Sequence, residues 1–339
     1  MNLSTSPQEN GTDCRNVSRA AVQAVQTPTI SARQGRSAWC GMGCAPALLT
    51  AVVLCCLMWV LPGLSTAAED GGGKVFLWSF AAEKGTLYLL GSVHVLRPDV
   101  YPLDERIDRA YEASRRVVFE ADVKEIAGDD VQQVLKEHGM YGDDATLKEY
   151  ISGDTFRLLQ NHAQTAGIPP ARFERMKPWL CAVTLSGAEL SRLGFRPELG
   201  IDAHYAARAE KDGKERIFLE SARFQVELLA GMPGEQQEEL LRQALRELEV
   251  IGEKSDALVS AWKRGDADAL EAIVGISLKE YPRIRKALFT DRNLSWMSCL
   301  EKLLESEGDT LVIVGAGHLV GEDGILNLLR RKGYNPVQH

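Results

Sequence analysis

Two histidines near opposite ends of the chain stand in the same local pattern. Segments 87–94 (LYLLGSVH) and 311–318 (LVIVGAGH) each contain four apolar residues followed by Gly-x-x-His. The apolar run predicts a buried strand, and the glycine after it lets the chain turn sharply. His94 and His318 are therefore expected just past the carboxyl end of a strand, where open α/β sheets bind ligands. One such histidine would more often be a loop or core residue, but the matched pair favours a functional site.

Two glutamates occupy the corresponding position after other apolar runs. Glu120 follows 117–119 (VVF), and Glu220 follows 217–219 (IFL). Such an acid can also cap the next helix, so its position alone leaves both roles open. Together with the histidines, however, these acids suit a site in which two imidazoles and a carboxylate hold a divalent metal and leave positions for water and substrate. A carboxylate near the interior of a sheet needs a metal or an arginine as its partner.

Arg292 is the arginine that could supply this partner. It lies in 291–293 (DRN), at the predicted start of a helix, where a cation opposes the helix dipole. Two interpretations remain open at this stage. The side chain could form a surface salt bridge, or it could orient a carboxylate or stabilise an oxyanion.

Several functional classes are unsupported. There is no His-Glu-x-x-His, no Gly-x-x-x-x-Gly-Lys-[Ser/Thr] and no Gly-x-Ser-x-Gly. Segment 315–321 (GAGHLVG) imitates a dinucleotide fingerprint, but its spacing differs and the chain ends before a βαβ unit could be completed. The net charge of −8 gives no basic surface for a nucleic-acid backbone, so no nucleic-acid partner is expected.

The body of the chain, 74–339, is predicted to be one α/β domain. Strand-like runs occur at 75–80, 86–90, 116–119, 216–219 and 311–314. Helical patterns occur in two blocks, one at 130–137, 154–166, 178–193 and 201–210, the other at 235–251, 256–264, 266–274, 282–288 and 291–305. This order indicates a central sheet with the Gly-x-x-His motifs at strand ends and with large helical insertions.

The N-terminal part differs from this body. Residues 1–44 form a polar, basic extension, and 45–68 have the composition of a signal peptide or N-terminal anchor: an uncharged apolar run followed by Pro-Gly and small residues. We therefore expect the body to be exported to an extracytoplasmic location, periplasmic or membrane-anchored, with the membrane contacted only through the N-terminal segment.

Taken in order, the motifs resemble those of the TraB/GumN family (TraB/PrgY/GumN), which includes the Tiki-like metalloproteases. Two Gly-x-x-His motifs, a glutamate and an arginine are its hallmarks, and Ser92 stands where the family usually has threonine. The resemblance extends over about 75–337 and rests on 87–94, 117–120 (VVFE), 200–202 (GID), 218–220 (FLE) with Gln225, 292–293 (RN), and 314–319 (VGAGHL) with Gly324 and 333–334 (GY).

The resemblance implies a fold similar to that of the erythromycin esterases and ChaN-like proteins, and a metal-dependent peptidase acting on a peptide or protein. His94, His318 and Glu120 would be ligands of Mn, Co or Zn, and Glu120, Glu220 and Arg292 would be catalytic. Two alternatives share the same residues: a non-enzymatic protein that sequesters a peptide or a haem-like ligand, and a metal-free hydrolase that uses histidine and glutamate. The oligomeric state stays open.

Overall fold

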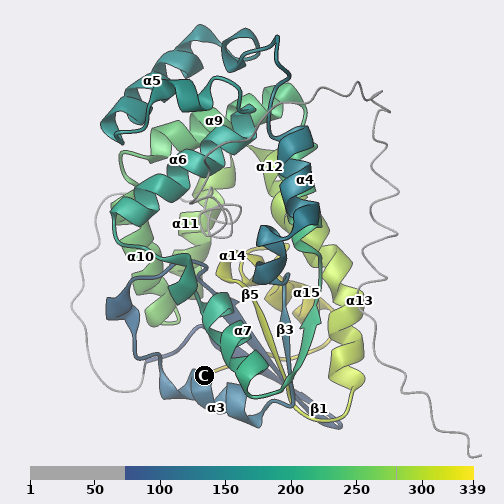
Figure 1. The fold of residues 1–339 in the computed structure, drawn as a ribbon. Helices are drawn as coiled ribbons and strands as arrows, with labels where there is room; N and C mark the ends of the chain where they lie inside the picture. The colour runs from purple at the N-terminus through teal and green to yellow at the C-terminus, as the bar shows by residue number, and fades with distance from the viewer. Residues whose placement is uncertain (1–72, 280) are drawn as a thin grey trace, which may run out of the picture.

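A computed structural model describes residues 73–279 and 281–339, drawn in colour in Figure 1. The predicted extension and leader, 1–68, lie outside the described residues. The described chain is built on a sheet of six strands: β1 (Leu77–Ala82), β2 (Gly85–Ser92), β3 (Arg116–Phe119), β4 (Glu215–Phe218), β5 (Thr310–Gly315) and β6 (Val337–Gln338). The first five overlap the predicted runs. β6 was not predicted, because two residues are too few to show a periodicity.

The sheet is mixed, and its parallel part positions the site. The strand order is β4-β3-β5-β2-β1-β6, with β4, β3, β5 and β2 parallel and with β1 antiparallel to both β2 and β6. Every residue of β3 and β5 is buried, as expected for parallel strands covered on both faces. Ser92 is opposite Gly315 and Phe119 is opposite Phe218. The carboxyl ends of the four parallel strands therefore lie along one edge.

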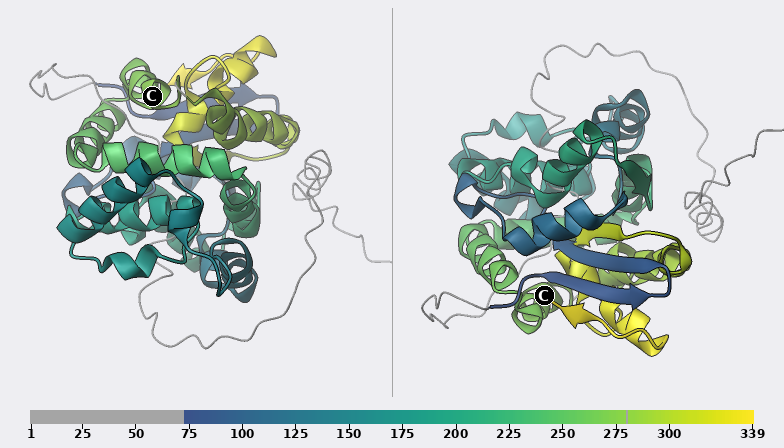
Figure 2. Two further views of the ribbon diagram at one scale, coloured as in Figure 1. Left: turned by 90° about the horizontal axis from the view of Figure 1, so that it is seen from above. Right: turned by 90° about the horizontal axis from the view of Figure 1, so that it is seen from below.

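Helices make up most of the remaining chain, and they confirm the α/β class with helical insertions. In Figure 1, α5, α6 and α9 pack together at the top, beyond the carboxyl edge of the sheet, while α7 and α13 lie nearer the strands. Figure 2 shows the same layers from above and below. The helices are α3 (Glu105–Ala113), α4 (Asp129–His138), α5 (Gly153–Thr165), α6 (Pro178–Arg192), α7 (Ile201–Lys211), α8 (Ala222–Ala230), α9 (Gly234–Glu247), α10 (Ile251–Lys263), α11 (Ala267–Lys279), α12 (Pro282–Arg285), α13 (Asp291–Glu305), α14 (Ala316–Leu319) and α15 (Ile325–Arg331).

Four of these helices, α3, α8, α14 and α15, lie outside the predicted helical segments. They are short, and α8 follows directly on Glu220 with Ser221 as its N-cap, so its apolar residues merge with those of the preceding strand. Within 73–279 and 281–339, no helix is both long and apolar enough to cross a membrane.

Candidate functional site

His94 is held by an aspartate from a different part of the chain. Its Nδ1 atom lies 2.6 Å from Oδ2 of Asp202, in the first turn of α7, and the Ser92 hydroxyl donates to the same oxygen. The backbone of α7 also begins against this segment, since Ile201 N–H donates to the Val93 carbonyl. A Cβ on Gly200 would overlap the carbonyl oxygen of His94, so this approach requires glycine.

This pairing fixes which nitrogen of His94 is available. A carboxylate only accepts hydrogen bonds, so Nδ1 carries a proton and Nε2 presents its lone pair in the neutral ring. No hydrogen bond to Nε2 is formed within the part of the chain that the structure describes, and the side chain is 15% exposed. Burial lowers the pKa of His94, but the charge and hydrogen bond of Asp202 outweigh it and raise the pKa above the usual 6.5. An imidazole in this state can accept a proton at Nε2.

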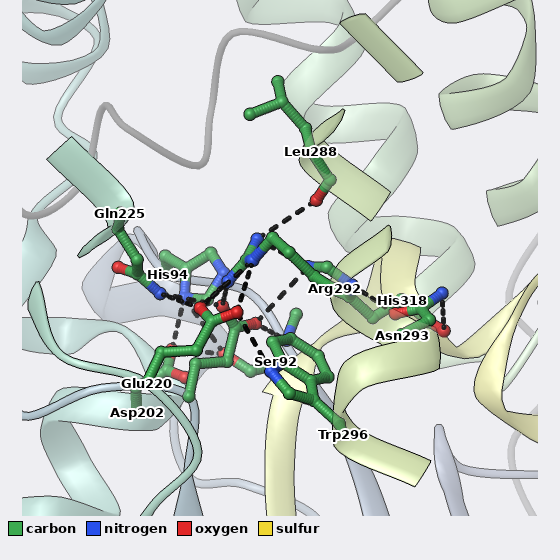
Figure 3. A network of polar contacts seen from close by, with 12 residues as sticks. Ser92, His94, Asp202, Glu220, Gln225, Leu288, Arg292, Asn293, Trp296 and His318 are labelled. Carbon is green, nitrogen blue, oxygen red and sulfur yellow. Dashed lines mark hydrogen bonds and ion pairs between the residues drawn. The ribbon is translucent and has the colours of Figure 1, made fainter. Parts of the chain in front are cut away.

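Arg292, in the first turn of α13, joins the other predicted residues (Figure 3). Its Nη2 donates to Oε2 of Glu120 at 2.6 Å and to Oε2 of Glu220 at 2.8 Å, and Nε donates to Glu220 at 3.1 Å. Nη1 donates to the Leu288 carbonyl at 3.1 Å and lies 3.0 Å from Nε2 of His318. Each of the five N–H groups of the guanidinium therefore has a protein partner.

The two glutamates are consequently buried around one cation. Their side chains are 3% and 0% exposed, and Glu120 also accepts the Gly315 N–H at 2.6 Å. Burial by itself would raise the pKa of Glu120. The charges of Arg292 and the neighbouring histidines have the larger, opposite effect, and they lower this pKa to about 2. Glu120 is thus a carboxylate at neutral pH. Glu220 also accepts a hydrogen bond from Trp296 Nε1 at 3.0 Å. Burial raises the pKa of Glu220, and this outweighs the lowering effect of the Arg292 charge.

His318, on α14, is also fully buried. It is 1% exposed and lies between the rings of Trp296 and Phe289, at 4.6 and 4.8 Å between ring centroids. Because Arg292 can only donate, Nε2 of His318 accepts, and Nδ1–H donates to Oδ1 of Asn293 at 2.6 Å. Burial lowers the pKa of His318 to about 3, so the ring is neutral.

The two Gly-x-x-His motifs meet at Gly315. A Cβ built on this residue would lie 2.9 Å from Nε2 of His94, 3.2 Å from Oε1 of Glu120 and 3.5 Å from Cδ2 of His318. The two histidines, expected to share one site, therefore converge on the same small space. His94 and Glu120 present donor atoms to it, whereas His318 presents a carbon.

This geometry tests the predicted metal site. A three-ligand site needs three donor atoms facing one point, and the third predicted donor, His318 Nε2, faces Arg292 instead. Among residues 73–279 and 281–339, no group of three or more His, Cys, Asp or Glu is placed to hold a metal ion. The donor set as arranged does not fit the metal, and a bound Mn, Co or Zn stays a prediction from the family resemblance.

Two small cavities adjoin His94. One, of about 40 Å³, is lined by the polar side chains of His94, Glu120, Asp202 and Gln225 together with small and apolar residues. An apolar one, of about 80 Å³, reaches His94 and His318 from the other side. Glu220 and Arg292 line neither cavity. Of the five predicted site residues, His94 lines both cavities.

Three residues of the site were not assigned a role from sequence: Asp202, Gln225 and Asn293. Each lies in a segment or at a position that carries the family resemblance, yet each is on a helix, and an acid in a first helical turn is ordinary. The distance along the chain also hides the pairing, since Asp202 and His94 are 108 positions apart.

Comparison with known proteins places the chain among relatives. The sequence profile of the TraB/PrgY/gumN family matches residues 76–338. The chain is similar to the uncharacterized protein YbaP of Escherichia coli (strain K12) and to that of Shigella flexneri, each 27% identical over 72% of this chain and 87% of the relative. It is also similar to an uncharacterized protein of Treponema pallidum (strain Nichols), 22% identical over 83% of this chain and 91% of the relative. No solved structure matches.

Proposed function

The chain belongs to the TraB/PrgY/gumN family, and from the geometry of its site we propose that it is a hydrolase that cleaves peptide bonds with water activated by His94. The observation that carries this proposal is the His94–Asp202 pair. It combines a fixed tautomer, a raised pKa and an Nε2 atom without a hydrogen bond from the described chain, beside two cavities.

The reaction follows from the positions of these groups. A water molecule in the cavity lined by His94, Glu120 and Asp202 gives its proton to Nε2 of His94, and its oxygen attacks the substrate carbonyl carbon. Asp202 stabilises the imidazolium that forms. The protonated His94 then donates to the amide nitrogen as the carbon–nitrogen bond breaks, so the products are a carboxylic acid and an amine.

The buried charged residues around Arg292 hold the backbone and side chains next to His94 in position for this step. The pKa of Glu120 is about 2 and that of His318 is about 3, so at neutral pH both groups are much weaker bases than His94. Arg292 holds both glutamates, and Glu120 in turn accepts the N–H of Gly315, next to Nε2 of His94. These contacts give Glu120, Glu220, Arg292 and His318 a positioning role, different from the catalytic and ligand roles expected from sequence.

The substrate class and the cellular location of the protein are proposed from two different observations. The peptide substrate rests on the family resemblance, and export rests on the composition of 45–68, so the substrate proposed is an extracytoplasmic peptide. The metal predicted from the resemblance takes part in no step here, because His318 Nε2 is engaged by Arg292.

The experiment is peptide hydrolysis in water labelled with heavy oxygen. The full chain is incubated with a mixture of synthetic peptides that samples all pairs of neighbouring residues, and products are identified by mass spectrometry. We expect new carboxyl groups that carry one labelled oxygen, absent with His94→Gln and retained with His138→Gln, a change at an exposed histidine. If the wild-type chain yields no labelled product, hydrolysis is refuted and the sequestering alternative gains.

A further inference from the structure

The apolar cavity beside His94 is built from two sides. On one side are the site residues at the ends of β2 and β5, including His94 and His318. On the other are side chains of the helical insertion: Ser255, Leu258 and Val259 of α10, and Val274 of α11, with Phe195 and Phe289 completing the wall. Helices α10 and α11 pack against each other, and α11 also contacts α14, which carries His318, so the two helices form this wall of the cavity.

Ser255 is polar, unlike the apolar helix residues Leu258, Val259 and Val274 that line the cavity with it. It is 3% exposed, and its hydroxyl has no hydrogen-bond partner within the described chain. A buried hydroxyl without a partner destabilises a protein, and most such groups in native structures are satisfied. Its position in the wall of a cavity that reaches the general base suggests that the missing partner belongs to a bound molecule.

We propose that this cavity is the subsite for a small aliphatic side chain of the substrate, and that the Ser255 hydroxyl hydrogen-bonds the substrate backbone. This inference rests on the proposed function, and it names the class of residue next to the cleaved bond. An aliphatic side chain among Leu258, Val259 and Val274 would bring its own carbonyl group close to His94, because His94 lines the same small cavity.

The size of the cavity sets the size of the side chain. A protein cavity of about 150 Å³ accommodates benzene, which has six carbon atoms. At about 80 Å³, this cavity has room for about three carbon atoms, the number in a valine side chain. Aromatic side chains are too large unless the wall is cut back.

The test measures binding of two probes to the full chain, N-acetyl-L-valinamide and N-acetyl-L-phenylalaninamide, by calorimetry or saturation-transfer NMR. We expect the valine probe to bind and the phenylalanine probe to bind at least about tenfold more weakly. Ser255→Ala should weaken the valine probe by about three- to tenfold. Ser260→Ala, at an exposed serine on the same helix, should leave its binding unchanged.

Two further readouts separate binding from a structural role. Ser255→Ala should leave the melting temperature unchanged or raise it, since a hydroxyl without a partner is removed. Leu258→Ala, which enlarges the cavity, should improve binding of the phenylalanine probe relative to the valine probe. The subsite is refuted if the valine probe fails to bind the wild-type chain, if Ser255→Ala binds it as well as wild type, or if Leu258→Ala leaves the ratio of the two affinities unchanged. Binding of the probe without any peptide cleavage would support the subsite and refute only the hydrolase.

Discussion

Asp202 and His94 form a hydrogen-bonded pair at the carboxyl edge of the sheet, 2.6 Å apart between Oδ2 and Nδ1. One residue follows β2 and the other begins α7, so the pair exists only in the folded chain. The pair holds the imidazole of His94 in a fixed orientation, with its side chain partly exposed, next to the buried charges of Glu120 and Arg292.

The first prediction concerns the pH dependence of hydrolysis. His94 acts as a base only when neutral, and Asp202 raises its pKa above 6.5, so activity should be lost as pH falls through a midpoint above 6.5. Asp202→Asn removes the charge that raises this pKa. The midpoint should therefore move to lower pH, while the rate at its plateau falls by on the order of 10². A pH–rate profile of both proteins checks this, and an unchanged midpoint in Asp202→Asn would contradict it.

The second prediction concerns the space over Gly315. The φ angle of −49° suits any residue, but a Cβ there would lie 2.9 Å from Nε2 of His94. Gly315→Ala should therefore fold and displace the His94 ring, with activity reduced by on the order of 10². Circular dichroism and a cleavage assay measure the two effects. Full activity in this variant would show that Nε2 does not act in this space.

The third prediction concerns the buried cation. Arg292→Ala leaves Glu120 and Glu220 without their partner, so the free energy of unfolding should fall by about 3–5 kcal/mol. Arg157→Ala breaks an exposed pair with Asp154, and should change it by less than ~1 kcal/mol. Denaturant unfolding of both variants measures the difference. Equal effects would mean that Arg292 does not hold the two carboxylates.

The fourth prediction concerns stability in acid. The pKa of His318 is about 3 in the folded chain, below its usual 6.5, so the unfolded chain binds more protons between these values and stability falls as pH falls. His318→Gln removes this term. Between pH 6.5 and ~5, the wild-type chain should lose about 1.6 kcal/mol more than the variant. Unfolding curves at several pH values test this, and parallel losses would show that His318 is not held neutral.

The site residues that could be anticipated from the sequence are those that follow the parallel strands of the sheet. Glu120, Glu220 and His94 lie within two residues of the ends of β3, β4 and β2, and parallel strands bring their carboxyl ends to one edge, so their proximity could be anticipated. The pattern of apolar runs likewise placed five of the six strands.

The rest depended on how helices are rotated against the sheet. The partner of His94, Asp202, comes from α7. The apolar periodicity of that helix does not predict that its first turn lies against the end of β2. Likewise, the hydrogen bond from His318 to Asn293 decides that its Nε2 faces Arg292, and this choice of nitrogen separates a metal ligand from a buried acceptor.

A cleavage assay in strong chelator tests most directly whether His94, paired with Asp202, activates water without a bound metal. The full chain is treated with chelator and assayed on the peptide mixture, beside Asp202→Asn and beside samples to which manganese, cobalt or zinc is returned. We predict that the chelated wild-type chain keeps its rate, that added metal raises it less than about twofold, and that Asp202→Asn is slowed by on the order of 10². Loss of activity in chelator with recovery on adding one metal would contradict the account.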